Sequence, residues 1–133
     1  MPSKKKNKLN AKKSTPLYRK SALRKGDLVM VIAGGHKEKR PNKGQVGRIV
    51  GFTGKGGQRV LVEGLNLMTK HQRQTAPDKP HGIMKKEGGI HLSNVMYYVE
   101  KIKKPVRLRH KFLDDGQKVR GYTDPESKDF VQI

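Results

Sequence analysis

The sequence predicts a mainly β fold, a small β-barrel or sandwich, and three observations support this prediction. Short runs rich in β-branched residues recur at even spacing, and glycine-rich turns separate them. No window carries a sustained helical stripe of apolar residues with helix caps. The length of 133 residues fits one domain of roughly 100–200 residues. Together these features disfavour a helix-rich fold.

Strand character begins after residue 26 and recurs along the chain. The expected strands are residues 28–33, 45–52, 59–63, 65–68 and 90–99. In the second of these strands, Val46, Arg48 and Val50 occupy alternate positions, so we expect all three side chains on one face. Residues 105–113 and 118–122 predict a closing hairpin, with Asp114-Asp115-Gly116 as its turn.

Two segments lack strand character. Residues 69–89 are polar, contain Pro77, Pro80 and three glycines, and predict a long basic hairpin loop. A loop of this length in a small domain is usually functional or disordered. Residues 123–133 predict a polar tail.

The charge balance predicts a polyanionic partner. The chain has 31 Lys and Arg against 11 Asp and Glu, a formal charge of +20, and only 32% apolar residues. Self-repulsion of this size destabilises an isolated compact protein. Residues 1–113 hold 28 of the basic groups and 6 of the acidic ones. Residues 1–22 have no acid and no apolar stripe, so they predict a disordered basic arm that becomes ordered on phosphates. A merely solubilising tail is the alternative for this arm.

Catalysis and metal binding have little support in the sequence. The absence of Cys excludes disulfides, thiolate chemistry and sulfur-ligated zinc. The histidines lack paired ligand spacing, and the glycine cluster at 54–57 lacks the phosphate-loop pattern and a following helix. We therefore expect no cofactor, no metal and no small-molecule substrate. The longest apolar run, residues 28–35, is far shorter than the ~20 residues of a membrane helix, so no membrane partner is expected.

Basic loops on a β scaffold favour binding of a folded RNA through its backbone and shape. Aromatic residues make up only 5% of the chain, which argues against reading unpaired bases by ring stacking. The candidate RNA-binding residues lie before the first strand, in the loop that follows it, in the second strand and in the long basic loop. They are Lys25, His36, Lys37, Lys39, Arg40, Lys43, Arg48, Lys70, His71, Arg73 and Lys85.

Several segments resemble one known family. Residues 25–34 (KGDLVMVIAG) and 43–49 (KGQVGRI) are similar to the KOW motif. Residues 62–66 (VEGLN), Lys70-His71 and residues 89–95 (GIHLSNV) follow in an order that resembles the bacterial-type ribosomal large-subunit protein twenty-four. Residues 105–107 and 113–120 agree with the same family. The resemblance covers residue 23 to about residue 127, and the loop at 35–43 is longer than is usual in the family.

The resemblance implies an SH3-like β-barrel that binds large-subunit ribosomal RNA directly and contacts neighbouring ribosomal proteins. It implies action early in subunit assembly, a position near the polypeptide exit tunnel and no catalytic activity. It also suggests a division into a basic arm (1–22), a KOW barrel core (23–72), a loop with the strands that complete the domain (73–122) and a tail (123–133). The expected location is the cytoplasmic ribosome.

Two alternatives are open at this stage. A KOW-bearing transcription elongation factor uses a similar barrel to bind proteins, although such factors normally carry an α/β domain ahead of it. The lysine-rich N-terminus is also compatible with an organellar presequence, and so with an organellar ribosome, although it has a single Arg before position 20.

Overall fold

The computed structural model describes residues 21–35, 38 and 41–133. This part of the chain contains β-strands and two short 3-10 turns and no α-helix, which confirms the mainly β class. Apart from residues 21 and 22, the predicted basic arm lies outside the described residues. The elements are β1 (Leu28–Val31), β2 (Val46–Thr53), η1 (Lys55–Gly57), β3 (Arg59–Val62), β4 (Leu67–Gln72), β5 (Gly82–Glu87), β6 (Ile90–His91), η2 (Leu92–Asn94), β7 (Val95–Val99), β8 (Lys104–Val106), β9 (Leu108–Phe112), β10 (Lys118–Thr123) and β11 (Phe130–Gln132).

The main sheet is antiparallel and has the order β6-β3-β2-β1-β7-β8. The ends of β1, β2 and β3 each lie within two residues of the ends expected from the sequence. The expected strand at 90–99 is interrupted, because η2 separates β6 from β7. Since η2 joins the edge strand β6 to a strand near the opposite edge, the sheet must curl back on itself. No pairing between β6 and β8 closes it among the described residues.

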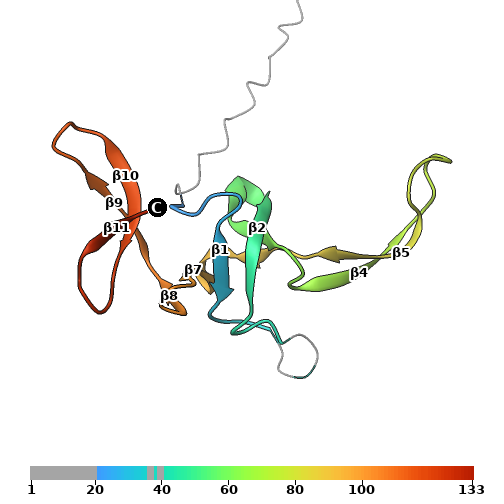
Figure 1. Ribbon diagram of the computed structural model, residues 1–133. Helices are drawn as coiled ribbons and strands as arrows, with labels where there is room; N and C mark the ends of the chain where they lie inside the picture. The colour runs from blue at the N-terminus through green and yellow to red at the C-terminus, as the bar shows by residue number, and fades with distance from the viewer. Residues whose placement is uncertain (1–20, 36–37, 39–40) are drawn as a thin grey trace, which may run out of the picture.

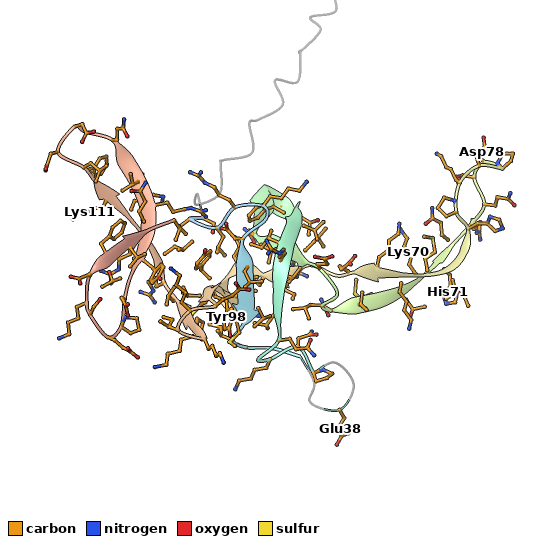
Figure 2. All side chains as sticks on the ribbon, in the orientation of Figure 1. Glu38, Lys70, His71, Asp78, Tyr98 and Lys111 are labelled. Atoms are coloured by element: carbon orange, nitrogen blue, oxygen red, sulfur yellow. The ribbon has the colours of Figure 1, made fainter. Side chains whose placement is uncertain are left out.

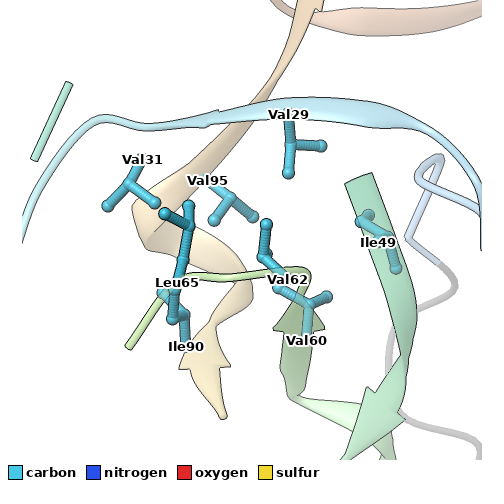
Figure 3. Close-up of a cluster of buried hydrophobic side chains, with 8 residues drawn as sticks. All are labelled: Val29, Val31, Ile49, Val60, Val62, Leu65, Ile90 and Val95. Carbon is cyan, nitrogen blue, oxygen red and sulfur yellow. The ribbon is translucent and has the colours of Figure 1, made fainter. Parts of the chain in front are cut away.

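One small apolar core fills the inside of this curl. Its members come from β1, β2, β3, β6, β7 and the turn after β3, and Figure 3 shows them converging. They are Val29, Val31, Ile49, Val60, Val62, Leu65, Ile90 and Val95. Alternation along β1 and β3 sends every second side chain inward. Full burial of one such aliphatic side chain stabilises the fold by roughly 1.5–3 kcal/mol.

The C-terminal residues form a second sheet with the order β11-β10-β9. The predicted Asp-Asp-Gly turn is present, with Gly116 at φ 79° and its amide donating to the Leu113 carbonyl at 2.9 Å. The segment expected to be a polar tail contains β11, which pairs with β10. The polar composition of this segment does not indicate a strand. Its packing comes from the ring of Phe130, which lies against Gly121, and the sequence pattern does not reveal this contact.

The segment expected to be one long loop is largely a two-stranded ribbon. Residues Leu67–Gln72 pair in register with Gly82–Glu87, so only residues 73–81 form the turn. The expectation of strand residues at 65–68 was therefore wrong in its bounds. Leu65 belongs to the core, and β4 begins at Leu67 and runs four residues further than expected. Prolines and glycines lie in the turn and at the ends of this ribbon. Its polar middle is held in strand conformation by the backbone pairing of β4 with β5.

An ion pair joins the two sheets. The Arg120 guanidinium donates from Nη1 to Asp27 Oδ2 at 2.5 Å and from Nη2 to Asp27 Oδ1 at 3.1 Å. Nη1 also donates to the Ala22 carbonyl at 2.9 Å. The side chains are only 14% and 10% exposed for Arg120 and Asp27. A second apolar cluster of Val99, Val106 and Tyr122 lies at the same junction.

We expect that Gly47 is required because a side chain at this position would clash inside the fold. A Cβ at this position would lie 2.7 Å from Val62 Cγ1 and 3.0 Å from the Glu63 carbonyl oxygen. Gly47→Ala should therefore lower the free energy of unfolding by about 1–3 kcal/mol, the usual cost of overpacking. Gly51→Ala is the matched control in the same strand, because nothing lies within 4 Å of a Cβ there. Equal urea midpoints for the two variants would contradict this assignment.

Asp27→Asn should also destabilise the fold, because it leaves a largely buried guanidinium without its counter-charge. We expect a loss of about 2 kcal/mol, below the ~3–5 kcal/mol of a fully buried pair. Asp78→Asn makes the same chemical change at an exposed turn position and should leave the melting temperature unchanged. A melting curve of Asp27→Asn that matches the wild-type curve would show that the pair is dispensable.

Candidate nucleic-acid interface

The β4–β5 hairpin extends away from the main sheet (Figure 1), and among the described residues its two strands contact each other far more than any other strand. Its apolar side chains are not covered, and Ile83 is 71% exposed. An isolated two-stranded hairpin is marginally stable in water. The shape of this element therefore points to a partner that contacts it along its length.

The hairpin carries cations on both of its faces. The register pairs Lys70 with Met84 and His71 with Ile83, so consecutive residues point to opposite sides. Figure 2 shows Lys70 and His71 on opposite sides of the ribbon. By the same register, Lys86 shares a face with Lys70, and Lys85 shares the other face with His71. Such a ribbon suits a position between two phosphate backbones better than one on a flat surface.

Acidic groups do not neutralise this charge. Residues 67–87 contain five Lys or Arg and two acids, Asp78 and Glu87. Asp78 lies in the exposed turn, and Glu87 lies at the root, where its carboxylate accepts from the Gly64 amide at 3.5 Å. The cations of the middle of the hairpin are thus available to an external anion.

Two asparagines tie the root of the hairpin together and connect it to the loop before β2. The Asn66 carbonyl accepts from the Gly88 amide at 2.8 Å, and the Asn66 side-chain Oδ1 accepts from Asn42 Nδ2 at 3.3 Å. Asn66 itself has a φ of 51°, a left-handed conformation that asparagine tolerates better than most residues. The root therefore lies beside the loop that carries Lys43.

A cavity of about 260 Å³ lies at the same end of the sheet. Arg59 and His91, which are register partners across β3 and β6, line it together with three side-chain amides and several glycines. The amides belong to Asn42, Asn66 and Asn94. Amide and guanidinium donors suit phosphate and sugar oxygens. The volume is below the roughly 300–1,000 Å³ of small-molecule sites, so it fits a single phosphate or sugar.

Sequence reasoning missed Arg59, His91 and the three asparagines. Arg59 and His91 are far apart in the chain, and only the β3–β6 pairing brings them together. One signal in the sequence could have found His91 and Asn94, namely the group of polar residues beside glycines at 88–94. Above, this group serves only as part of the family resemblance.

The seven described candidate residues are all exposed but do not form a single cluster. The hairpin brings together Lys70, His71, Arg73 and Lys85. Lys43 precedes β2, near the root, and Lys25 precedes β1 at the opposite end of that strand pair. His36, Lys37, Lys39 and Arg40 lie outside the described residues.

Arg48 lies on the outer face of the main sheet, as the alternation predicted. It is exposed between the exposed Val46 and Val50, and its register partner on β1 is Leu28. Glu63 follows the strand beside Arg48 and would be a nearby carboxylate for it, but among the described residues the two side chains form no ion pair. The guanidinium can therefore reach an external phosphate.

The described residues contain no group of three or more His, Cys, Asp or Glu side chains arranged to hold a metal ion. Within the same residues, no helix has the length and apolar character needed to cross a membrane.

Comparisons with known proteins point to one family. The profile of a family described as "Large ribosomal subunit protein uL24, C-terminal domain" matches residues 65–124. The large ribosomal subunit protein uL24 of Geobacter metallireducens is 48% identical over 104 residues, covering 78% of this chain and 89% of that protein. The protein of the same name from Caldanaerobacter subterraneus is 44% identical over 98 residues, covering 74% of this chain and 85% of that protein.

The chain belongs to the uL24 family. This confirms the resemblance drawn from residues 25–120 and identifies a structural protein of the large ribosomal subunit. Because uL24 proteins are structural components of the ribosome, the chain is not an enzyme, and its location is the cytoplasmic ribosome. The uL24 relatives also favour the ribosomal interpretation over the elongation-factor alternative.

Arg48→Ala should weaken binding to a large-subunit RNA fragment and leave the fold intact. The expected loss is about 1–3 kcal/mol, the scale of hydrogen bonds to a charged group. Arg48→Lys should recover only part of the affinity, because Lys lacks the planar two-pronged donor. Filter binding and thermal melting on the same samples give both quantities. Unchanged affinity with a lowered melting temperature would refute the RNA role and indicate an internal role.

Proposed function

We propose that this uL24 protein binds large-subunit ribosomal RNA directly, through the β4–β5 hairpin and the glycine-rich end of the main sheet. The observation that carries the proposal is the set of unneutralised cations on both faces of an uncovered hairpin. The root fixes the direction of this hairpin, so its cations are presented as a group. The cavity beside the root supplies neutral and charged donors for one further phosphate or sugar.

Recognition would depend on backbone and shape. Lysines on opposite faces of a narrow ribbon can neutralise two phosphate backbones at once, and each neutralised phosphate releases condensed counterions. The amides and the Arg59 guanidinium at the cavity would then fix the register of the RNA. This division fits folded RNA, which proteins read largely through its shape and sugar-phosphate surface.

The family resemblance supports the finer parts of the proposal. We infer that the curled main sheet is the SH3-like barrel of the KOW class, and that residues 23–72 and 73–122 divide the body as expected above. We also infer binding early in subunit assembly, a place near the polypeptide exit tunnel and contacts with neighbouring ribosomal proteins. The uncovered apolar side chains of the hairpin, among them Leu67 and Met68, support such contacts.

A salt titration tests direct RNA binding. On a large-subunit RNA fragment, the logarithm of the binding constant should fall linearly with the logarithm of salt concentration, by about 0.7–0.9 per phosphate neutralised. The double variant Lys70→Gln/Lys85→Gln should reduce that slope by about 1.4–1.8, the contribution of two lost phosphate contacts. Lys104→Gln on β8 provides a control at an exposed lysine distant in the chain from the hairpin. A wild-type slope near zero would rule out the proposed contact.

A further inference from the structure

The C-terminal sheet carries an exposed phenylalanine that does not pack into the apolar core clusters. Phe112 ends β9 and is 66% exposed. Phe130 is a useful contrast on the same sheet, because its ring lies against Gly121 so closely that a Cβ there would be 2.6 Å from Phe130 Cζ. Neither ring belongs to an apolar core cluster, and each has a lysine Nζ 5.9 Å from its centre, Lys111 for Phe130 and Lys118 for Phe112. The difference is exposure, because Phe130 is half-buried and Phe112 is exposed.

The surroundings of Phe112 are basic and ordered by strand register. Lys118 is its cross-strand partner, and the Lys118 Nζ lies 5.9 Å from the centre of the Phe112 ring. His110 lies two residues earlier on β9 and therefore on the same face. Arg109 and Lys111 occupy the other face of the strand. A single exposed apolar side chain is ordinary, but an exposed ring with an ammonium over it and a histidine beside it is a specific arrangement.

We propose that Phe112 stacks on an unpaired base of the ribosomal RNA while Lys118 and His110 contact the adjoining phosphates. The inference rests on the proposed RNA binding and adds a second contact site with its own chemistry. Aromatic rings bind splayed-out RNA bases by stacking, and a nearby cation adds to the interaction. The proposal runs against the expectation drawn from the low aromatic content, because one suitably placed ring is sufficient for one stack.

The positive charge around Phe112 favours RNA over a protein segment as the occupant. Residues 107–118 contain four Lys or Arg, His110 and two acids, and both acids lie in the turn beyond Phe112. A polyanion would therefore approach along the strands and avoid the turn. Figure 1 places this sheet and the β4–β5 hairpin on opposite sides of the main sheet, so the two sites would contact different RNA segments.

Tryptophan fluorescence tests the stacking directly, because the chain contains no Trp. Phe112→Trp should bind a large-subunit RNA with nearly wild-type affinity, and its emission should be quenched on binding as the indole stacks on a base. Ser127→Trp is the control on the same sheet's connecting loop, which also holds Asp124, Glu126 and Asp129. Its emission should not change, because this acidic loop repels the RNA backbone.

Affinity measurements provide the second test. Phe112→Leu keeps an apolar side chain but removes the ring, so binding should weaken about five- to hundredfold, the range for loss of one base stack. Phe112→Tyr should bind like the wild type, and the circular dichroism spectra of all variants should agree because the position is exposed.

The outcomes separate this inference from the proposed function. If the wild type binds RNA but Phe112→Trp is not quenched and Phe112→Leu binds equally well, the stacking site is wrong and the proposed function stands. A blue shift of Phe112→Trp that appears only on assembled subunits, and not on RNA alone, would identify a protein neighbour and overturn the inference. Failure of the wild type to bind RNA at all would overturn both.

Discussion

The pairing of Asp27 with Arg120 is the constraint on which the arrangement of the molecule depends. Asp27 lies in the turn before β1, where its Oδ2 also accepts from the Arg24 amide at 2.7 Å. Arg120 lies in β10, and its own carbonyl accepts from the Ile133 amide at 3.0 Å. One largely buried charge pair thus connects the first turn of the main sheet, the middle of the C-terminal sheet and the end of the chain. The small cluster around Val99, Val106 and Tyr122 provides a second, apolar contact between the two sheets.

This junction matters because the rest of the charge opposes compactness. The main core is a cluster of eight small and medium aliphatic side chains, while the formal charge is +20. In the part of the chain that the structure describes, no polar or charged residue is fully buried, so the charges of those residues lie at or near the surface. In the proposed complex, neutralisation by RNA would relieve the repulsion, because a ligand that binds only the folded state stabilises it. Folding and the proposed RNA binding would then be coupled through electrostatics.

Sequence reasoning succeeded where one strand's own pattern carries the information. Runs of β-branched residues located β1, β2 and β3, alternation along β2 placed Arg48 on the outer face, and Asp114-Asp115-Gly116 gave the turn of the C-terminal hairpin. It failed where the information lies in pairing between distant segments. The β4–β5 ribbon has a polar pattern, and β11 depends on the fit of Phe130 against Gly121. The cavity requires Arg59 and His91 to meet across β3 and β6, which neither local sequence predicts.

The importance of strand pairing also explains an advantage of placing two of the proposed RNA contacts on paired ribbons rather than on irregular loops. A flexible basic loop loses much conformational entropy when it is ordered on a ligand. In the β4–β5 hairpin, backbone pairing from Leu67↔Glu87 to Gln72↔Gly82 has already fixed which lysines share a face. In the C-terminal hairpin, the pairing of Lys118 with Phe112 likewise fixes the ammonium near the ring. The ordering cost is therefore met largely by folding, and more of the phosphate interaction remains to stabilise the complex.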